Sequence, residues 1–291
     1  MMKEENISDS EIRVIGGGNI PPKSSFPWRF VGLVVAALAV VGLAVWLLWP
    51  KAEVEPDEPG VFDPGIVVEQ PHPLRDWLGG LDSLNVSATA TKDVTVNDIL
   101  LRAYVPLNST PHLEVGYGVV DHSKDNILFF QAADVRADNK KIVGAFVLKG
   151  KPLSWGLSKR GYCAIIDGKV TVGVADNSPL FEMATDRKGY FFRQYPLVDN
   201  GKLVESELKN KTIRRALCEI DDHIVVVESQ TLESMHDFAQ ALVDIGASNA
   251  IYLVGSSAMG WCVDVEGNER KMGLWDPRAY KNISFIVWPK Q

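Results

Sequence analysis

The sequence contains little cysteine and little histidine, with three cysteines and five histidines among 291 residues. The three thiols, Cys163, Cys218 and Cys262, allow at most one internal disulfide with one thiol left over, so a disulfide-rich scaffold is excluded. Their spacing matches no metal-binding motif. We therefore expect buried, small apolar residues at these positions, and the sequence predicts neither a metal site nor a cofactor.

Basic charge is also scarce, because 30 lysines and arginines stand against 37 acidic residues, a formal net charge of −7. After Lys51 the balance is 25 basic to 33 acidic residues, a formal −8. The sequence has no basic stripe that would neutralise the phosphates of a nucleic acid. Nucleic acid is therefore excluded as a partner.

One long apolar run is present, Phe30–Trp49, which holds no charged residue. As a helix this run would span about 30 Å, the thickness of the hydrocarbon core of a bilayer. Trp28 and Trp49, near its two ends, suit the headgroup region. A cleaved signal peptide has a shorter apolar core of about 7 to 15 residues, so we expect an uncleaved transmembrane helix at 30–49.

The charges on the two sides of this run differ. Arg13, Lys23 and Arg29 precede it, whereas four acidic residues follow Lys51 within eight positions. The positive-inside rule then puts the N-terminus in the cytoplasm and the C-terminal domain in the periplasm or outside the cell. The expected organisation is a short cytoplasmic tail at 1–29, the transmembrane helix at 30–49, a linker rich in proline and acid at 50–75, and an exported domain at 76–291.

The exported part is rich in β-forming runs and has few helical patterns, which predicts the α+β class, a mixed β-sheet domain with few packed helices. Asp167-Gly168 predicts a hairpin, and Asn200-Gly201 predicts a second tight turn. The predicted strands are His112–Val120, Asn126–Ala132, Ile142–Leu148, Gly161–Ile166, Lys169–Val174, Gly189–Tyr195, Thr212–Ile220, His223–Glu228, Ala250–Val254, Trp261–Val265 and Ile283–Trp288.

Two segments have a helical period. The first is Val94–Val105. The second is Ser234–Ile245, where Ser234 to Asp237 resembles a capping box, the apolar residues share one face, and Gly246 ends the helix. The chain from Thr212 to Val254 therefore predicts two strands, a helix and a third strand that ends at Gly255.

That stretch and several earlier blocks resemble the phosphodiester glycosidase family. In the family a strand, a helix ending in Leu-Gly-Ala and a second strand lead into an Asp-Gly-Gly-Ser turn. The resemblance covers Glu114–Trp261 and implies a glycosidase, a hydrolase that acts on sugar phosphodiesters. The matching blocks are Ile245-Gly246-Ala247, Ala250–Leu253, Gly255-Ser256-Ser257, Ile213–Leu217 for an Arg-Thr-Ala block, Gln194–Val198 with Asn200-Gly201-Lys202, and Phe129–Ala133 for an Asn-Gly-Gly-Phe-Phe block.

The sequence departs from the family at positions that matter for chemistry. Val254 stands where the family has the Asp of its turn, Gln131 where it has Asn, and Cys218 where it has Gly. A valine side chain cannot bind a cation or take a proton. If the blocks align as above, one polar group of the family's site is missing.

The residues themselves indicate an anion site at the late turn. Glycine permits a sharp bend after Leu253, where backbone N–H groups, Ser256 and Ser257 could face a phosphate. The alternative is a tight turn whose serines satisfy nearby backbone groups. We expect Gly255, Ser256 and Ser257 to bind substrate, together with Gln131 and Gln194.

A phosphodiester also needs a counter-charge and an acid or base. Arg214 and Arg215 are adjacent, so only one of them can face the cleft in a strand, and the resemblance favours Arg214. Glu228, at the end of its strand, is the first carboxylate to consider and Asp134 the second. Arg214 and Glu228 are therefore the predicted catalytic residues.

Two functions remain open on the sequence alone. One is a membrane-anchored enzyme of the cell envelope that hydrolyses, or a domain that binds, a sugar phosphodiester or other phosphorylated or anionic glycan. The other is a catalytically inactive module that binds glycans or envelope proteins, which the valine at position 254 favours.

Overall fold

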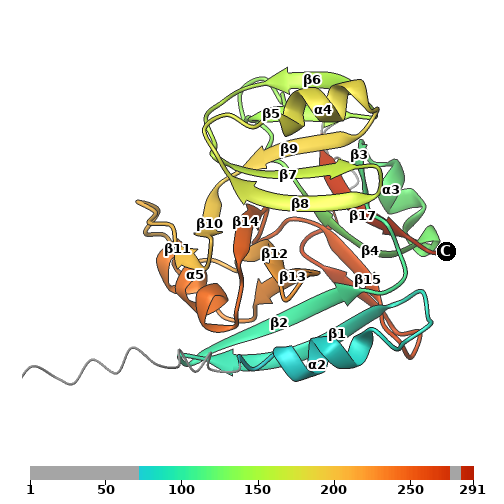
Figure 1. Cartoon of the computed structure of the whole chain (residues 1–291), viewed down its shortest axis with the longest axis vertical. Helices are drawn as coiled ribbons and strands as arrows, with labels where there is room; N and C mark the ends of the chain where they lie inside the picture. The colour runs from blue at the N-terminus through green and yellow to red at the C-terminus, as the bar shows by residue number, and fades with distance from the viewer. Residues whose placement is uncertain (1–71, 276–282) are drawn as a thin grey trace, which may run out of the picture. The chain divides into compact units, whose positions relative to one another are not determined.

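The computed structural model describes residues 72–275 and 283–291, all of which belong to one compact unit, Val68–Gln291 (Figure 1). The predicted cytoplasmic tail, the predicted transmembrane helix at 30–49 and most of the predicted linker at 50–75 lie outside these residues. Within the described ranges, no helix has both the length and the apolar character needed to cross a membrane. The described part is mostly β-sheet with few helices, as the predicted class requires.

A seven-stranded sheet, the first sheet, forms the centre of the fold. Its outer part is a hairpin of β1 and β2, and its middle strands come from late in the sequence. In spatial order its strands are β1 (Thr89–Val96), β2 (Ile99–Pro106), β13 (His223–Ser229), β12 (Arg215–Ile220), β14 (Asn249–Leu253), β10 (Pro196–Asp199) and β11 (Lys202–Leu203).

The predicted helix Val94–Val105 is wrong, because this segment forms the β1–β2 hairpin. Asn97 and Asp98, between the two strands, have φ angles of 48° and 61°. Two successive positive φ angles belong to the tight hairpin turn that matches the twist of antiparallel strands. Burial also alternates over Ile99–Ala103 of β2, which is the two-residue period of a strand rather than the period of a helix.

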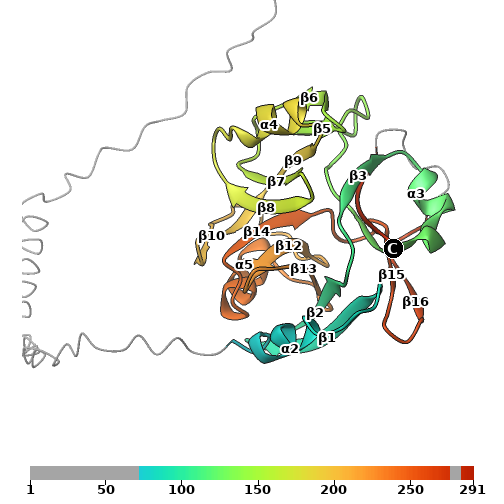
Figure 2. The same cartoon turned by 45° about the vertical axis from the view of Figure 1, so that its right-hand side comes forward.

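Two helices cover one face of the first sheet, α2 (Arg75–Leu81) and α5 (Met235–Asp244) (Figure 2). The prediction for α5 is confirmed, since the Ser234 hydroxyl accepts a hydrogen bond from the Asp237 N–H at 3.0 Å and Gly246 has a φ of 93°. α5 connects β13 to β14, which both pair with β12. As a result, the C-terminal ends of β13 and β14 lie on either side of the N-terminal end of β12.

The other face of the first sheet packs on two five-stranded sheets. The second sheet has the order β16 (Glu269–Met272), β15 (Gly260–Val263), β4 (Asn126–Gln131), β17 (Ser284–Pro289) and β3 (His112–Val115). The third sheet has the order β6 (Lys151–Trp155), β5 (Ala145–Leu148), β9 (Tyr190–Gln194), β7 (Gly161–Ile166) and β8 (Lys169–Val174).

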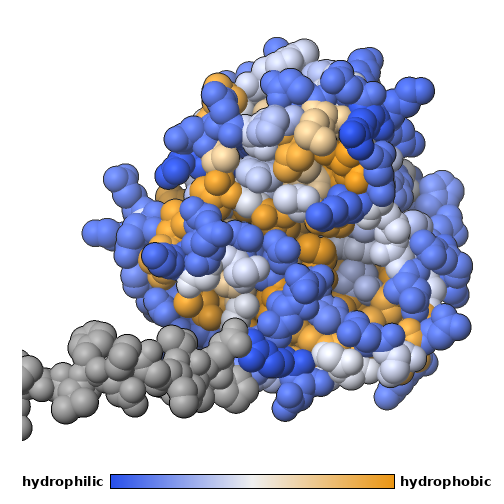
Figure 3. Space-filling view, viewed as in Figure 1, coloured by the Kyte–Doolittle hydropathy of each residue, from blue (hydrophilic) through white to orange (hydrophobic). Residues whose placement is uncertain are grey.

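Shorter helical elements complete the fold. α4 (Leu180–Asp186) packs on the third sheet. Near the second sheet, α3 (Gly118–Asp121) and a 3-10 turn (Ser123–Asp125) occupy the chain after β3. The predicted strand His112–Val120 is therefore correct only in its first half. Figure 3 shows that hydrophilic residues cover most of one face of the domain, with apolar groups between them.

All neighbouring strands in the three sheets pair antiparallel, so the predicted mixed sheet is wrong for the described strands. Hairpins between consecutive strands explain six of these fourteen pairings, because a tight turn can join only antiparallel neighbours. The predicted hairpin at Asp167-Gly168 is confirmed between β7 and β8, with φ angles of 50° and 80°. The three cysteines are buried, as expected, and none of them forms a disulfide.

Candidate functional site

Arg215 and Glu228 form a buried ion pair beside the glycine-serine turn. They are direct cross-strand partners on β12 and β13, and the Arg215 Nε donates to Glu228 Oε2. The guanidinium also donates to the backbone oxygens of Ala258, at 2.7 Å, and Val254, at 3.3 Å. It lies over the Phe130 ring, 5.1 Å from the centroid. Arg215 thus connects the carboxylate to both ends of the turn.

This pair belongs to a row of alternating charges across four strands. The register places Asp93 opposite Arg102, Arg102 opposite Glu228, and Glu228 opposite Arg215. Cross-strand partners share a face of a sheet, so each charge has an opposite neighbour. Arg102 and Asp93 line a cavity of about 470 Å³. Burial, and then the charge of Glu228, raises the pKa of the neighbouring Tyr104 far above its usual range.

Arg214, the predicted counter-charge, points elsewhere. Its Nε donates to the Glu233 backbone oxygen at 3.1 Å, and another guanidinium nitrogen donates to the Asn210 backbone oxygen. The guanidinium lies 5.9 Å from the centroid of Tyr252, on the helix-covered face of the first sheet. The side chain is 3% exposed. The structure therefore brings Arg215, and not Arg214, to Glu228 and the turn.

The turn itself uses its N–H groups inside the protein. The Gly255 N–H donates to the Tyr252 hydroxyl at 3.2 Å, and the Ser256 N–H donates to the Ile213 backbone oxygen at 2.8 Å. Ser256 has a φ of 55° and is exposed, as is Ser257. These two N–H groups are not available to an anion in this conformation, and the turn offers its two hydroxyls to solvent.

Gln194 lies in a separate cluster around a buried lysine. The Lys159 ammonium pairs with the Asp134 carboxylate and donates to the Gln194 side-chain oxygen at 2.8 Å. The Gln194 amide nitrogen donates to the Ala132 backbone oxygen at 3.1 Å. The lysine also lies 4.5 Å from the centroid of the Tyr195 ring. Asp134, the second carboxylate that the sequence indicates, therefore meets Gln194 through Lys159.

Gln131 is half-buried at the end of β4, directly opposite Phe285 on β17. Successive side chains of a strand point to opposite faces. Arg215 covers Phe130, so Gln131 points to the other side of β4. The structure thus does not gather Gln131, Gln194 and Arg214 around Glu228, and their predicted roles remain predictions.

Sequence reasoning missed Lys159 and gave Arg215 second place. The strand alternation correctly required that one of the two arginines face the turn, but the pattern alone could not decide which. Lys159 gave no signal, because a single lysine in a loop is most often solvated. Here it is 3% exposed. Burial lowers the pKa of Lys159 below its usual value, although the Asp134 carboxylate opposes this shift.

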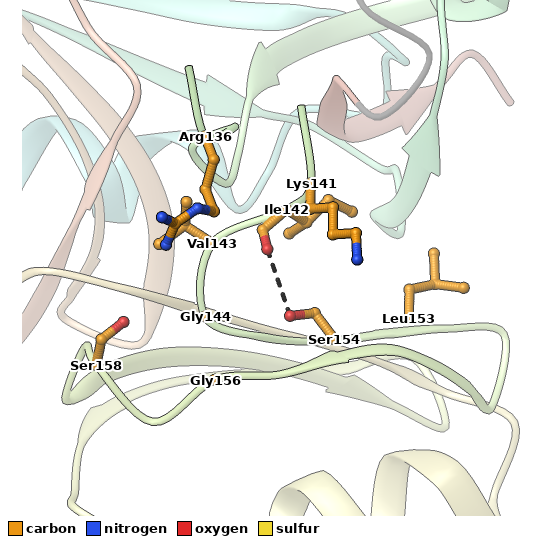
Figure 4. Close-up of a pocket in the computed structure, with 9 residues that line it drawn as sticks. All are labelled: Arg136, Lys141, Ile142, Val143, Gly144, Leu153, Ser154, Gly156 and Ser158. Carbon is orange, nitrogen blue, oxygen red and sulfur yellow. Dashed lines mark hydrogen bonds between the residues drawn. The ribbon is translucent and has the colours of Figure 1, made fainter. Parts of the chain in front are cut away.

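Figure 4 shows a cavity of about 540 Å³ with a mixed polar and apolar lining, and its lining residue Ser158 directly precedes Lys159 in the chain. One wall is the loop that follows β4, and the other is β6 with the loop after it. The side chains of Arg136, Lys141 and Ser154 border the same space in Figure 4, and the Ser154 hydroxyl donates to the Ile142 backbone oxygen at 3.3 Å. The cavity is further lined by Ile142, Val143, Gly144, Leu153, Gly156 and Ser158.

Arg136 and Lys141 give the cavity positive charge, and Asp138 is the counter-ion of Arg136. Arg136 forms two hydrogen bonds to the Asp138 carboxylate, at 3.0 and 3.2 Å. Both side chains are exposed, so water and salt screen this pair strongly. Lys141 supplies a second cation. Two cations and two hydroxyls on a half-open surface are donors that suit an anionic, hydroxyl-rich ligand.

Within residues 72–275 and 283–291, no three histidine, cysteine or acidic side chains are grouped so that they could hold a metal ion. Two histidines pair with surface acids, His223 with Asp82 and His236 with Glu205.

No family model and no curated protein matches the chain. Solved structures of similar fold include the following two. The first is the catalytic domain of zebrafish N-acetylglucosamine-1-phosphodiester alpha-N-acetylglucosaminidase, auto-inhibited by its pro-peptide, with a TM-score of 0.50 and 12% identity over 70% of this chain and 82% of that chain. The second is a hypothetical protein from Synechocystis, with a TM-score of 0.50 and 12% identity over 69% of this chain and 62% of that chain.

At 12% identity these likenesses show the fold alone. The described domain is therefore distantly similar in fold to the catalytic domain of a phosphodiester glycosidase.

Proposed function

We propose that this protein is a membrane-anchored envelope protein whose exported domain binds a phosphorylated or other anionic glycan without hydrolysing it. The observation that carries this proposal is the cavity lined by Arg136, Lys141, Ser154 and Ser158. Its cations suit a phosphate or carboxylate, and its hydroxyls and open backbone suit sugar hydroxyls. The anchor would be the apolar run 30–49.

The state of the predicted catalytic residues supports binding over hydrolysis. Glu228 is bound by Arg215, and Gln230 lies 3.4 Å from its second oxygen. Arg214 is bound by backbone oxygens. A general acid must reach the leaving oxygen, and a counter-charge must face the phosphate. Neither side chain is free for that role in this arrangement, and Val254 adds no polar group.

Hydrolysis of a sugar phosphodiester is the second candidate, and the fold likeness to a glycosidase catalytic domain favours it. For hydrolysis, Glu228 would have to leave Arg215 and contact the substrate. Arg215, rather than Arg214, would then supply the positive charge that faces the phosphate. Ser256 and Ser257 are the exposed hydroxyls nearest in sequence to the oxygens that Arg215 binds.

The test uses the purified full chain in detergent micelles with N-acetylglucosamine 1-phosphate and its methyl phosphodiester. Calorimetry measures binding, and released sugar measures hydrolysis. We expect binding without release, and we expect Arg136→Ser with Lys141→Ser to weaken binding roughly tenfold or more, because charge-assisted bonds to phosphate are lost.

The matched control is Arg160→Ser with Lys151→Ser. Like Arg136, Arg160 pairs with an acid, Asp176, and the two arginine side chains are 56% and 57% exposed, respectively. Neither Arg160 nor Lys151 is among the residues that line the cavity. An equal loss in both double variants would contradict the cavity as the site. Release of sugar that Glu228→Gln abolishes would establish the hydrolase instead.

A further inference from the structure

An ion pair between the buried Lys159 ammonium and the half-buried Asp134 carboxylate links the two walls of the cavity. Lys159 directly follows Ser158 of one wall, and Asp134 lies two residues before Arg136 of the other. We propose that Lys159 is a positioning residue, which sets the distance between the walls, and hence the affinity for the anionic ligand, without touching the ligand. This inference rests on the proposed function and names a residue that controls the same site.

The first wall is a narrow hairpin whose base is Asp134. The Val143 N–H donates to the Asp134 backbone oxygen at 2.8 Å. Val135 and Ile142 form an isolated antiparallel bridge. The Arg136 N–H donates to the Lys141 backbone oxygen at 2.9 Å. These bonds hold the backbones of Arg136 and Lys141 side by side, so a shift of Asp134 moves both residues together.

The second wall ends on Lys159. The Lys159 backbone oxygen accepts a hydrogen bond from the Arg193 guanidinium at 2.7 Å, which fixes the lysine to β9. Gly156 lies against Gly144 of the facing wall, where a Cβ on Gly156 would come within 3.3 Å of two Gly144 backbone atoms. The walls therefore touch at the glycines and are joined by the ion pair at one end and by the Ser154–Ile142 hydrogen bond and the β5–β6 pairing at the other.

Several groups around the Lys159 ammonium interact with its positive charge. Asp134 carries the opposite charge, Gln194 accepts a hydrogen bond, the Tyr195 ring lies against it, and the Arg193 guanidinium is bound to its carbonyl. The ammonium is almost fully buried, whereas the carboxylate is 32% exposed. Without the ammonium, Asp134 can turn toward water and take its hairpin along.

The experiment measures sulfate binding to the full chain in detergent micelles, because sulfate does not titrate above neutral pH. We expect Lys159→Met to weaken sulfate binding roughly fivefold or more, since it removes the charge that holds Asp134. Lys159→Arg should restore most of the affinity. Lys169→Met, the same change at an exposed lysine on β8, should leave it unchanged.

The pH profile separates positioning from a merely structural role. The pKa of Lys159 is lowered by burial, so the wild-type lysine loses its proton before ordinary lysines do, and sulfate affinity should fall there as pH rises. Lys159→Arg stays charged, so its affinity should persist to higher pH, and the other groups near the site, Lys141, Arg136 and Tyr195, are the same in both proteins.

The possible results are distinguishable. Failure of the wild type to bind sulfate overturns the proposed function together with this inference. Intact wild-type binding with unchanged affinity in a folded Lys159→Met variant, or identical pH profiles for wild type and Lys159→Arg, overturns the inference alone. If Lys159→Met does not fold, Asp134→Asn replaces it, and unchanged sulfate binding in that variant is equally decisive.

Discussion

At the scale of single residues, the Arg215–Glu228 pair is a costly arrangement that its surroundings make stable. Removing two charges from water costs several kcal/mol per ion unless each is paired and hydrogen-bonded. Glu228 receives the guanidinium, and the remaining donors of Arg215 reach the carbonyls of Val254 and Ala258. Each of the two buried charges therefore depends on the other, and removing either side chain leaves its partner unpaired.

We expect Arg215→Met to lower the free energy of unfolding by about 3–5 kcal/mol, because it leaves Glu228 charged and buried. The double variant Arg215→Met with Glu228→Leu should recover much of that loss. Urea unfolding of the wild type, both single variants and the double variant measures the coupling. A double variant with the summed losses of the two single variants would contradict the paired arrangement.

The same residues show what sequence reasoning can reach at this scale. Alternation along a strand established that Arg214 and Arg215 face opposite sides. Which side holds the turn depends on the register of β12 with β13 and β14, which no local pattern encodes. The role of Lys159 could not be predicted from local patterns either, because its partner Asp134 lies 25 residues away in the sequence.

At the scale of elements, the β1–β2 hairpin has two non-glycine residues in the left-handed region. Asn97 and Asp98 have φ angles of 48° and 61°. That region costs an ordinary L-residue about 1 kcal/mol, somewhat less for asparagine and aspartate. The Asn97 amide also donates to the Asp244 carboxylate on α5, so the turn is attached to the helix.

We therefore expect Asp98→Gly to raise the free energy of unfolding by about 0.5 kcal/mol, because Asn-Gly is the preferred pair for this turn and keeps Asn97. Asp98→Val should lower it by about 1 kcal/mol or more, since a branched side chain disfavours a positive φ. Chemical denaturation of the two variants checks the opposite signs. Equal effects of glycine and valine would refute the turn geometry.

Helix α5 was predictable because its signals are local, with a serine cap, one apolar face and a terminal glycine. The hairpin at 94–105 was misjudged because its apolar residues also fit a helical period over a short window. Asn97-Asp98 was the signal that could have corrected it. The order of strands in the three sheets depends on contacts between distant segments, which local patterns do not contain.

At the scale of the whole molecule, one core joins the three sheets. Leu217 of the first sheet, Leu128 and Ile286 of the second, and Phe146 and Ile165 of the third all belong to the same buried apolar cluster. A cluster shared in this way stabilises each sheet through the others. Such a domain is expected to unfold in a single cooperative transition. The exception would be a sheet that opens locally while the rest of the core stays packed.

The three cysteines can test this, because Cys218, Cys262 and Cys163 lie on β12, β15 and β7, one in each sheet. Burial raises the pKa of all three thiols, that of Cys262 to about 12, so at pH 8 they remain protonated and unreactive in the folded state.

We expect pulsed alkylation at increasing urea, with the labelled cysteines identified by mass spectrometry, to give the same midpoint for all three. The midpoint should equal that of the far-ultraviolet circular dichroism. A lower midpoint for Cys163 alone would mean that the third sheet, which carries Lys159 and one wall of the cavity, opens independently. The ligand site would then lie on a locally unstable part of the fold, and ligand should raise that midpoint before the others.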